Sequence, residues 1–121
     1  MEKIILVADD SPTIRKFVSF TLTARGFRII SASDGMEALE KLPSADIDLI
    51  ITDLNMPNID GYEFIRTVRS NSQYSDIPII ILSSLSKEAE IDEGLNCGAN
   101  SYLIKPFDPN RIAYEVSKYL N

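Results

Sequence analysis

The chain contains 121 residues, of which 45% are hydrophobic and 25% are charged, and this suits one globular domain with one core. Its formal net charge of −6 argues against binding to nucleic acid, because an acidic surface repels phosphates. No apolar stretch has the length of a membrane span or the form of a signal peptide, so we expect no contact with a membrane.

Two residue types are informative because they are scarce. The single cysteine, Cys97, excludes an intramolecular disulfide and favours a reducing cytoplasm. Histidine is absent, so the chain has no histidine base, histidine metal ligand or phosphohistidine of its own. The Gly-rich phosphate-binding patterns GxxxxGK[ST] and GxGxxG are absent too. We therefore expect any phosphoryl group on this chain to come from another molecule.

Five short runs rich in β-branched residues predict five strands. The first, third and fourth runs are almost continuously apolar, as the central strands of a parallel sheet should be. The second and fifth runs carry more polar residues and suit the edges of the sheet. The five runs are Lys3–Ala8, Phe27–Ala32, Asp48–Thr52, Pro78–Ser83 and Ser101–Ile104.

Helical patterns lie between and after these runs. The first begins at Ser11, a suitable N-cap before a proline, and ends at Gly26. The second begins near Asp34, with Glu37 in the position of a capping box. The third covers about residues 60–69 and the fourth about residues 86–98. The fifth begins at Asp108, with residues 112, 113, 116, 119 and 120 facing inward.

Five βα units in one domain predict an α/β fold with a parallel sheet and helices on both faces. The strand order 2-1-3-4-5, which flavodoxin-like folds have, places the three most apolar runs in the middle. We therefore expect a single (βα)5 flavodoxin-like domain over residues 1–121.

Ligands of such folds bind at the carboxyl ends of the strands, and this chain has polar residues there. Taken singly, each is an ordinary turn residue, cap or surface charge. Together they are chemically complementary, and the topology brings them to one edge of the sheet. They are Asp9 and Asp10 after the first run, Asp53 after the third, Ser83 and Ser84 at the fourth, and Lys105 and Pro106 after the fifth.

Three neighbouring carboxylates raise one another's pKa unless a cation lies among them. Oxygen ligands without histidine or cysteine select Mg²⁺ or a similar hard ion such as Mn²⁺. A carboxylate beside such an ion and a lysine can attack phosphorus. The residues therefore predict that Asp53 accepts a phosphoryl group whose other oxygens contact the ion, Lys105 and the Ser83 hydroxyl.

Four motifs, in this order and spacing, resemble the receiver domains of two-component response regulators. The likeness is strongest to the stand-alone chemotaxis type (CheY-like) and covers essentially the whole chain. The motifs are VADDSPTIRKF, DLIITDLNMPNIDGYEF, PIIILSS and GANSYLIKPF.

The resemblance implies roles at the metal and phosphoryl site. Asp53 matches the phosphoacceptor, and Asp10 the carboxylate that binds Mg²⁺ directly. Asp9 matches a neighbouring acid that acts largely through water. Asn55 matches the residue that offers its backbone carbonyl to the metal, and Lys105 matches the lysine that pairs with phosphoryl oxygens.

The resemblance also implies a switch. Ser83 matches the hydroxyl residue that follows the phosphate, and Tyr102 the aromatic residue that turns inward when Ser83 moves. Pro106 stands where the family usually has a cis peptide bond. The output face would comprise the fourth helix, the fifth strand and the fifth helix. We interpret Asp60 and Gly61 simply as the cap of the third helix.

Four further residues carry expectations. Leu85, like Asn55, stands where family members vary and tune the loss of phosphate, and its apolar side chain predicts slow hydrolysis. Ser84 adds a hydroxyl where a smaller residue is common. Gly94 weakens the fourth helix, at a cost of about 1 kcal/mol relative to alanine. Cys97 is expected to be a small buried residue at a helix end.

We therefore expect a cytoplasmic, monomeric switch that catalyses only its own phosphorylation and slow dephosphorylation. A sensor histidine kinase would supply the phosphoryl group, and a target protein such as a motor switch would receive the signal, since no output domain follows residue 121. Two alternatives stay open. One is an aspartate-nucleophile phosphohydrolase, which the missing DxD spacing and short chain disfavour. The other is a receiver-like interaction module that works without phosphorylation.

Overall fold

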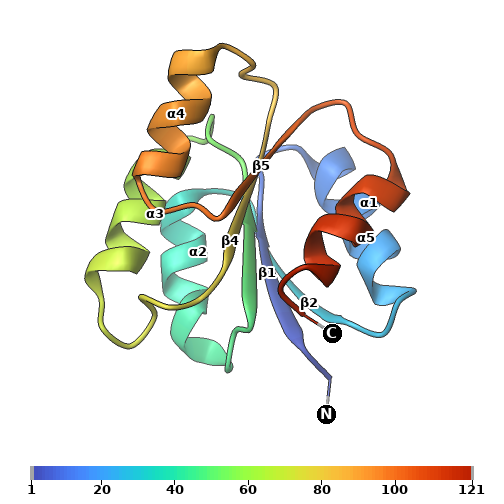
Figure 1. Ribbon diagram of the computed structural model, residues 1–121. Helices are drawn as coiled ribbons and strands as arrows, with labels where there is room; N and C mark the ends of the chain where they lie inside the picture. Colours follow the sequence, from blue (N-terminus) through green and yellow to red (C-terminus); the bar gives the residue numbers. More distant parts are fainter. Residues whose placement is uncertain (1, 121) are drawn as a thin grey trace.

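The computed structural model, which describes residues 2–120, confirms the predicted architecture (Figure 1). Five parallel strands form one sheet in the order β2-β1-β3-β4-β5. The strands are β1 (Ile4–Ala8), β2 (Arg28–Ala32), β3 (Leu49–Thr52), β4 (Ile79–Ser83) and β5 (Ser101–Ile104).

A helix follows each strand, and a short 3-10 turn at Leu42–Ser44 extends the second helix. Within residues 2–120, no helix is both long enough and apolar enough to span a bilayer. The helices are α1 (Pro12–Thr23), α2 (Gly35–Lys41), α3 (Gly61–Ser70), α4 (Glu88–Asn96) and α5 (Pro109–Ser117).

Helices cover both faces of the sheet, with α1 and α5 on one face and α2, α3 and α4 on the other (Figure 1). Alternate strand residues point to opposite faces, so each central strand contributes to two cores. In β1, for example, Ile5 packs with Val18 and Ile112 of α1 and α5. Its neighbour Leu6 packs on the other face with Phe64 of α3.

The burial of the strands confirms the predicted order. Every residue of β3 and β4 is buried, whereas the edge strands β2 and β5 each have one buried residue. In α5, the predicted inward positions Ile112 and Val116 are buried and Ala113 is half-buried. The helix ends at Ser117, and beyond it Leu120 is buried and Tyr119 half-buried.

Four helices begin at the predicted caps. The side chains of these caps accept the backbone N–H three residues on, at 2.8–3.3 Å. The caps are Ser11, Asp34, Asp60 and Asp108.

Helix α4 departs from the predictions. It begins at Glu88 rather than near Ser86, because the capping acceptor comes from inside the helix: the Glu90 carboxylate accepts the Lys87 N–H at 3.1 Å. Cys97, at the C-cap, is half-buried rather than buried, and Arg66 Nη1 lies 3.2 Å from its Sγ.

Candidate functional site

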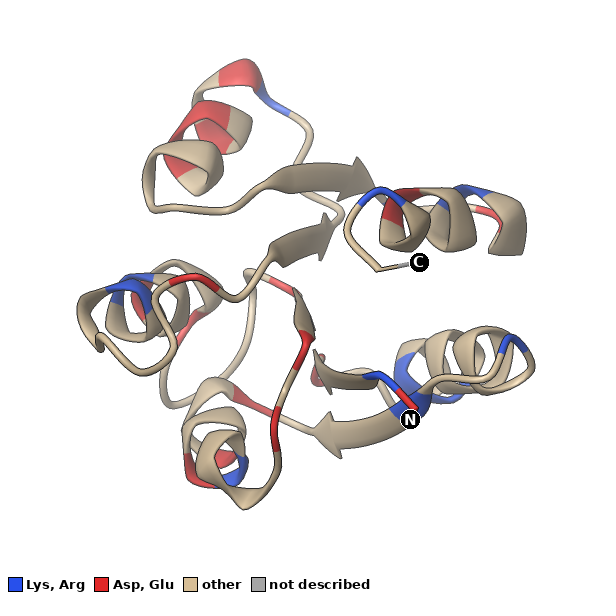
Figure 2. Cartoon of the chain, turned by 60° about the horizontal axis from the view of Figure 1, so that its bottom comes forward, with Lys and Arg blue, Asp and Glu red and all other residues tan. Residues whose placement is uncertain are grey.

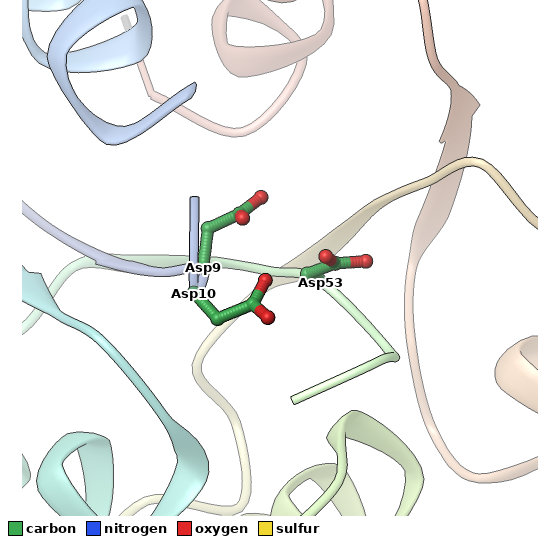
Figure 3. A group of neighbouring side chains, drawn as sticks. All are labelled: Asp9, Asp10 and Asp53. Carbon is green, nitrogen blue, oxygen red and sulfur yellow. The ribbon is translucent and has the colours of Figure 1, made fainter. Parts of the chain in front are cut away.

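Three carboxylates lie together where β1 and β3 end (Figure 3). Asp9, Asp10 and Asp53 each offer an oxygen, and these oxygens all lie within 4.8 Å of one another. The pairing of the two strands causes this, since Ala8 is opposite Thr52 and the Asp53 N–H donates to the Ala8 carbonyl at 2.9 Å. Asp9 and Asp53 are buried, and Asp10 is exposed.

Lys105 bridges two of these acids from the end of β5. Its Nζ lies 2.8 Å from Asp9 Oδ2 and 3.2 Å from Asp53 Oδ2. Burial alone would lower the pKa of Lys105, but its hydrogen bonds and attraction to Asp9 and Asp53 outweigh burial and raise it. Lys105 is therefore a fixed positive charge at the centre of the site.

Asp53 is 6% exposed, and its environment works against its negative charge. Burial raises the pKa of Asp53, and repulsion from Asp9 raises it further. Attraction to Lys105 and the hydrogen bond from the Leu54 N–H, at 2.7 Å to Oδ1, offset only part of this. The Asp53 carboxylate is thus fixed beside one cation, Lys105. The three carboxylates together carry more negative charge than this lysine neutralises.

The start of α3 packs closely against the loop that carries Asp53. The Gly61 N–H donates to the Leu54 carbonyl at 2.9 Å. A Cβ at Gly61 would collide with the Asp53 carbonyl oxygen and would lie 2.7 Å from Leu54 Cα. Gly61 is therefore required for the close approach of helix and loop, in addition to following the Asp60 cap.

Ser83, Leu85 and Tyr102 form a second connected group beside the carboxylates. The buried Ser83 Oγ accepts the Leu85 N–H at 3.1 Å, and the Tyr102 hydroxyl donates to the Leu85 carbonyl at 2.6 Å. Burial raises the pKa of Tyr102, so this phenol is neutral and a hydrogen-bond donor at physiological pH. The end of β4 and the ring on β5 are thus joined through one backbone segment.

The other predicted residues surround this site. Asn55 and Ser84 are exposed, so the Ser84 hydroxyl lies in solvent rather than in the core. Leu85 is half-buried and packs against the core on the α3 side of the sheet. The peptide bond between Lys105 and Pro106 is cis.

Two residues of the site were missed by sequence reasoning. Arg15 of α1 donates from Nη1 to the Asp9 carbonyl at 2.6 Å and so fixes the end of β1. Its position on the first helical turns was a usable signal, because that end of α1 faces the carboxylates. Gly61 had been interpreted only as part of a cap, and no local pattern reveals that another backbone packs against it.

Comparison with known proteins agrees with this geometry. Residues 5–117 match the family described as the response regulator receiver domain. The chain is 41% identical to Chemotaxis protein CheY1 of Helicobacter pylori over 96% of this chain and 95% of that protein. It is 39% identical to the Chemotaxis protein CheY homolog of Campylobacter jejuni, over 96% of this chain and 91% of that protein.

Solved structures show the same fold. The chemotaxis response regulator CheY4 of Vibrio cholerae superimposes with a TM-score of 0.93 at 39% identity, covering 99% of this chain and all of that one. Strand order, the acidic cluster and the sequence matches agree over nearly the full length. The chain belongs to the family of response regulator receiver domains.

Proposed function

We propose that this chain is a phosphorylation-dependent switch of two-component signalling, in which Asp53 accepts a phosphoryl group from a phosphohistidine of a sensor histidine kinase. The observation that carries the proposal is the position of Lys105, whose Nζ lies between the buried carboxylates of Asp9 and Asp53. A structural ion pair needs one acid, whereas a phosphoryl-transfer site needs a carboxylate nucleophile and cations for the phosphoryl oxygens.

The residues divide the chemistry between them. An Asp53 oxygen forms a bond to phosphorus while the bond from phosphorus to the donor's imidazole nitrogen breaks. The electron pair of that bond stays on the nitrogen, which solvent protonates. Lys105 Nζ, which contacts Asp53 Oδ2 at 3.2 Å, stabilises charge on the phosphoryl oxygens. The Ser83 hydroxyl exchanges its bond with the Leu85 N–H for one to the phosphoryl group.

The oxygen atoms at this site suit a hard divalent cation, which would be Mg²⁺ or, as a substitute, Mn²⁺. Its ligands are oxygens, and within residues 2–120 the Asp10 carboxylate takes part in no salt bridge or hydrogen bond. Asp10, Asp53 and the backbone carbonyl of Asn55 would hold the ion, and Asp9, paired with Lys105, would act through water. When bound, the ion supplies positive charge that neutralises the acids and the incoming phosphoryl oxygens.

The effect of phosphorylation would be transmitted from Asp53 to the protein surface through Ser83 and Tyr102. A move of the Ser83 hydroxyl changes its bond to Leu85, whose carbonyl accepts the Tyr102 hydroxyl, and Tyr102 lies on β5 beside α4. We propose that α4, β5 and α5 form the face whose affinity for a target protein changes. Residues 1–121 would act as one cytoplasmic, monomeric receiver domain, and the names of the relatives favour a role in chemotaxis or motility.

The test is incorporation of phosphate by the wild type and two matched variants. With Mg²⁺ and acetyl phosphate, intact-mass spectrometry should detect one added phosphoryl group on the wild type and none on Asp53→Asn. Asp48→Asn is the control, because Asp48 flanks the opposite end of β3 and its Oδ2 accepts the Ile4 N–H at 2.8 Å. Equal labelling of wild type and Asp53→Asn would refute the proposal and favour a module that works without phosphorylation.

A further inference from the structure

The loop between β3 and α3, residues 53–60, is joined to the start of α2. Asn58 of this loop donates from Nδ2 to Asp34 Oδ2 at 2.9 Å. The other oxygen of Asp34, Oδ1, accepts the Glu37 N–H at 2.8 Å as the cap of α2. One carboxylate therefore fixes the first turn of α2 and the loop at the same time.

Asn58 has an unusual backbone conformation. Its φ is 69°, and within residues 2–120 it is the one non-glycine residue with a positive φ. Left-handed backbone is unfavourable for most side chains, although Asn and Asp tolerate it. Such a conformation persists where surrounding contacts impose it, and it is found most often at functional sites. Here the contact of the Asn58 side chain is its hydrogen bond to Asp34.

A second contact between the loop and α2 follows directly. Gly35, the first residue of α2, is buried, and a Cβ on it would collide with the Ile59 carbonyl oxygen. The same Cβ would lie 3.0 Å from Ile59 Cβ. Two consecutive loop residues, Asn58 and Ile59, thus lie against the start of α2, so the course of the loop depends on that helix.

The start of α2 lies at the same edge of the sheet as the carboxylate cluster. Ala32 at the end of β2 is opposite Ala8 at the end of β1, and its carbonyl accepts the Asp9 N–H at 3.1 Å. Asp34 and Asp10 each follow two residues after these strand ends. A contact made by Asp34 can therefore influence the residues around the metal site.

The loop also leads from Asn58 back to Asn55. Within residues 2–120, no backbone N–H donates to the Asn55 carbonyl. The next residue, Met56, is buried, and the Ile59 N–H donates to the Pro57 carbonyl at 2.9 Å. The position of the Asn55 carbonyl is consequently set through residues 56–59, whose far end is joined to Asp34.

From these contacts we propose that Asp34 and Asn58 are positioning residues that hold the Asn55 carbonyl where it can bind the divalent cation. The inference rests on the proposed function, which makes that carbonyl a metal ligand. Mg²⁺ requires nearly ideal octahedral geometry, so a displaced ligand binds it less well. Residues that orient metal ligands commonly change metal affinity when they are replaced.

An exchange of the two side chains tests the proposal. Asp34→Asn keeps a good cap for α2 but places an amide donor opposite the Asn58 amide. Asn58→Asp keeps a residue that tolerates left-handed backbone but places two carboxylates face to face. The double variant Asp34→Asn/Asn58→Asp restores one donor and one acceptor, and its net charge stays at −6. Isothermal titration calorimetry of the full chain with MgCl₂ measures the affinity.

Each single variant should bind Mg²⁺ about fivefold more weakly, and the double variant about as tightly as the wild type. Charge alone predicts the opposite sign for Asn58→Asp, because an added carboxylate attracts the cation. Acids lie on several helices and loops of the chain (Figure 2), so the loss of any acid weakens this attraction. Glu37→Gln measures that general effect, because it removes an acid one turn from Asp34 and leaves the bond to Asn58 intact.

The proposal is overturned if Asn58→Asp binds Mg²⁺ more tightly than the wild type. It is also overturned if Asp34→Asn weakens binding no more than Glu37→Gln does.

NMR of the Asn55 carbonyl carbon adds a direct readout of the ligand itself. Mg²⁺ should shift this signal in the wild type and the double variant, and shift it less in the single variants. An equal shift in all four proteins would contradict the proposal.

These outcomes are separate from those of the proposed function. Equal Mg²⁺ affinity of the wild type and Asp53→Asn would count against the metal site itself. Mg²⁺ binding that requires Asp53 but is the same in the wild type and both single variants would remove only the role of Asp34 and Asn58.

Discussion

The two oxygens of the Asp53 carboxylate have different partners, and this fixes the plane of the group. Oδ1 accepts the Leu54 N–H at 2.7 Å, and Oδ2 contacts Lys105 Nζ at 3.2 Å. A nucleophile held by both oxygens loses little further freedom when it reacts. At the residue scale, the proposed function then makes the lifetime of the phosphorylated state depend on how water reaches this carboxylate.

Leu85 offers water no hydrogen bond, because its half-buried side chain packs against the core. We expect Leu85→Glu to speed loss of phosphate about tenfold, since one well-placed hydrogen bond to the attacking water is worth about 1.4 kcal/mol in the barrier. Release of inorganic phosphate after removal of acetyl phosphate measures the rate.

Two control variants distinguish a hydrogen bond to the attacking water from easier access of water to Asp53. Leu85→Gln keeps the hydrogen-bonding capacity without the charge, and Leu85→Ala only removes bulk. If Leu85→Ala accelerates release as much as Leu85→Glu, the leucine acts by shielding the site. If none of the three variants changes the rate, Leu85 does not control hydrolysis.

At the scale of the element, α4 contacts the rest of the protein more through its backbone than through its side chains. Gly94 is its one buried residue, and the Glu90 carbonyl accepts the Tyr62 hydroxyl. Sequence reasoning treated Gly94 as a simple weakness of the helix. The structure adds a reason for it, because the missing side chain lets Ile81 and the Tyr102 ring pack against the helix.

We therefore expect the effect of Gly94→Ala on the free energy of unfolding to depend on the residue at position 81. The alanine gains about 1 kcal/mol of helix propensity, but its methyl group would lie 2.7 Å from Ile81 Cδ1, and overpacking costs about 1–3 kcal/mol. In an Ile81→Val background that atom is gone, and the same substitution should stabilise the protein. Urea unfolding of the four proteins gives the coupling free energy, which we expect to be about 1 kcal/mol or more. Equal effects of Gly94→Ala in both backgrounds would contradict this packing.

At the scale of the whole molecule, periodicity and turn chemistry predicted the five strands, the central place of three of them and four helix caps, whereas the exact strand order came from the flavodoxin-like fold. These signals are local: continuous apolar runs for β1, β3 and β4, and an acceptor three residues before a donor at each cap. The topology predicted that Lys105 and Asp9 reach the same edge of the sheet, but their direct bridge could not be predicted, because it joins residues 96 positions apart and depends on how the side chains pack. The role of Gly61 escaped for the same reason, since it depends on which backbone lies against the helix. The start of α4 depends instead on a local hydrogen bond, from the Lys87 N–H to the Glu90 carboxylate, in place of a cap side chain.

The buried acids also predict how global stability depends on pH. Burial and the repulsion from Asp9 raise the pKa of Asp53 above its ordinary value of 3.8. Between these two pKa values the folded state binds more protons than the unfolded state, so this group's contribution to stability falls as pH rises. In metal-free buffer at pH 7, Asp53→Asn should therefore unfold at a higher temperature than the wild type, and the difference should shrink as pH falls toward 3.8.

Thermal unfolding with a chelator and with Mg²⁺ tests both the pH effect and the metal site. An ion that binds only the folded protein raises its unfolding temperature by mass action. Mg²⁺ should thus stabilise the wild type more than Asp53→Asn, because the wild type has one more carboxylate to neutralise. A wild type more stable than Asp53→Asn at pH 7 without metal would show that Lys105 compensates Asp53 fully. An equal response of the two proteins to Mg²⁺ would place the ion away from Asp53, and the proposed site would have to be withdrawn.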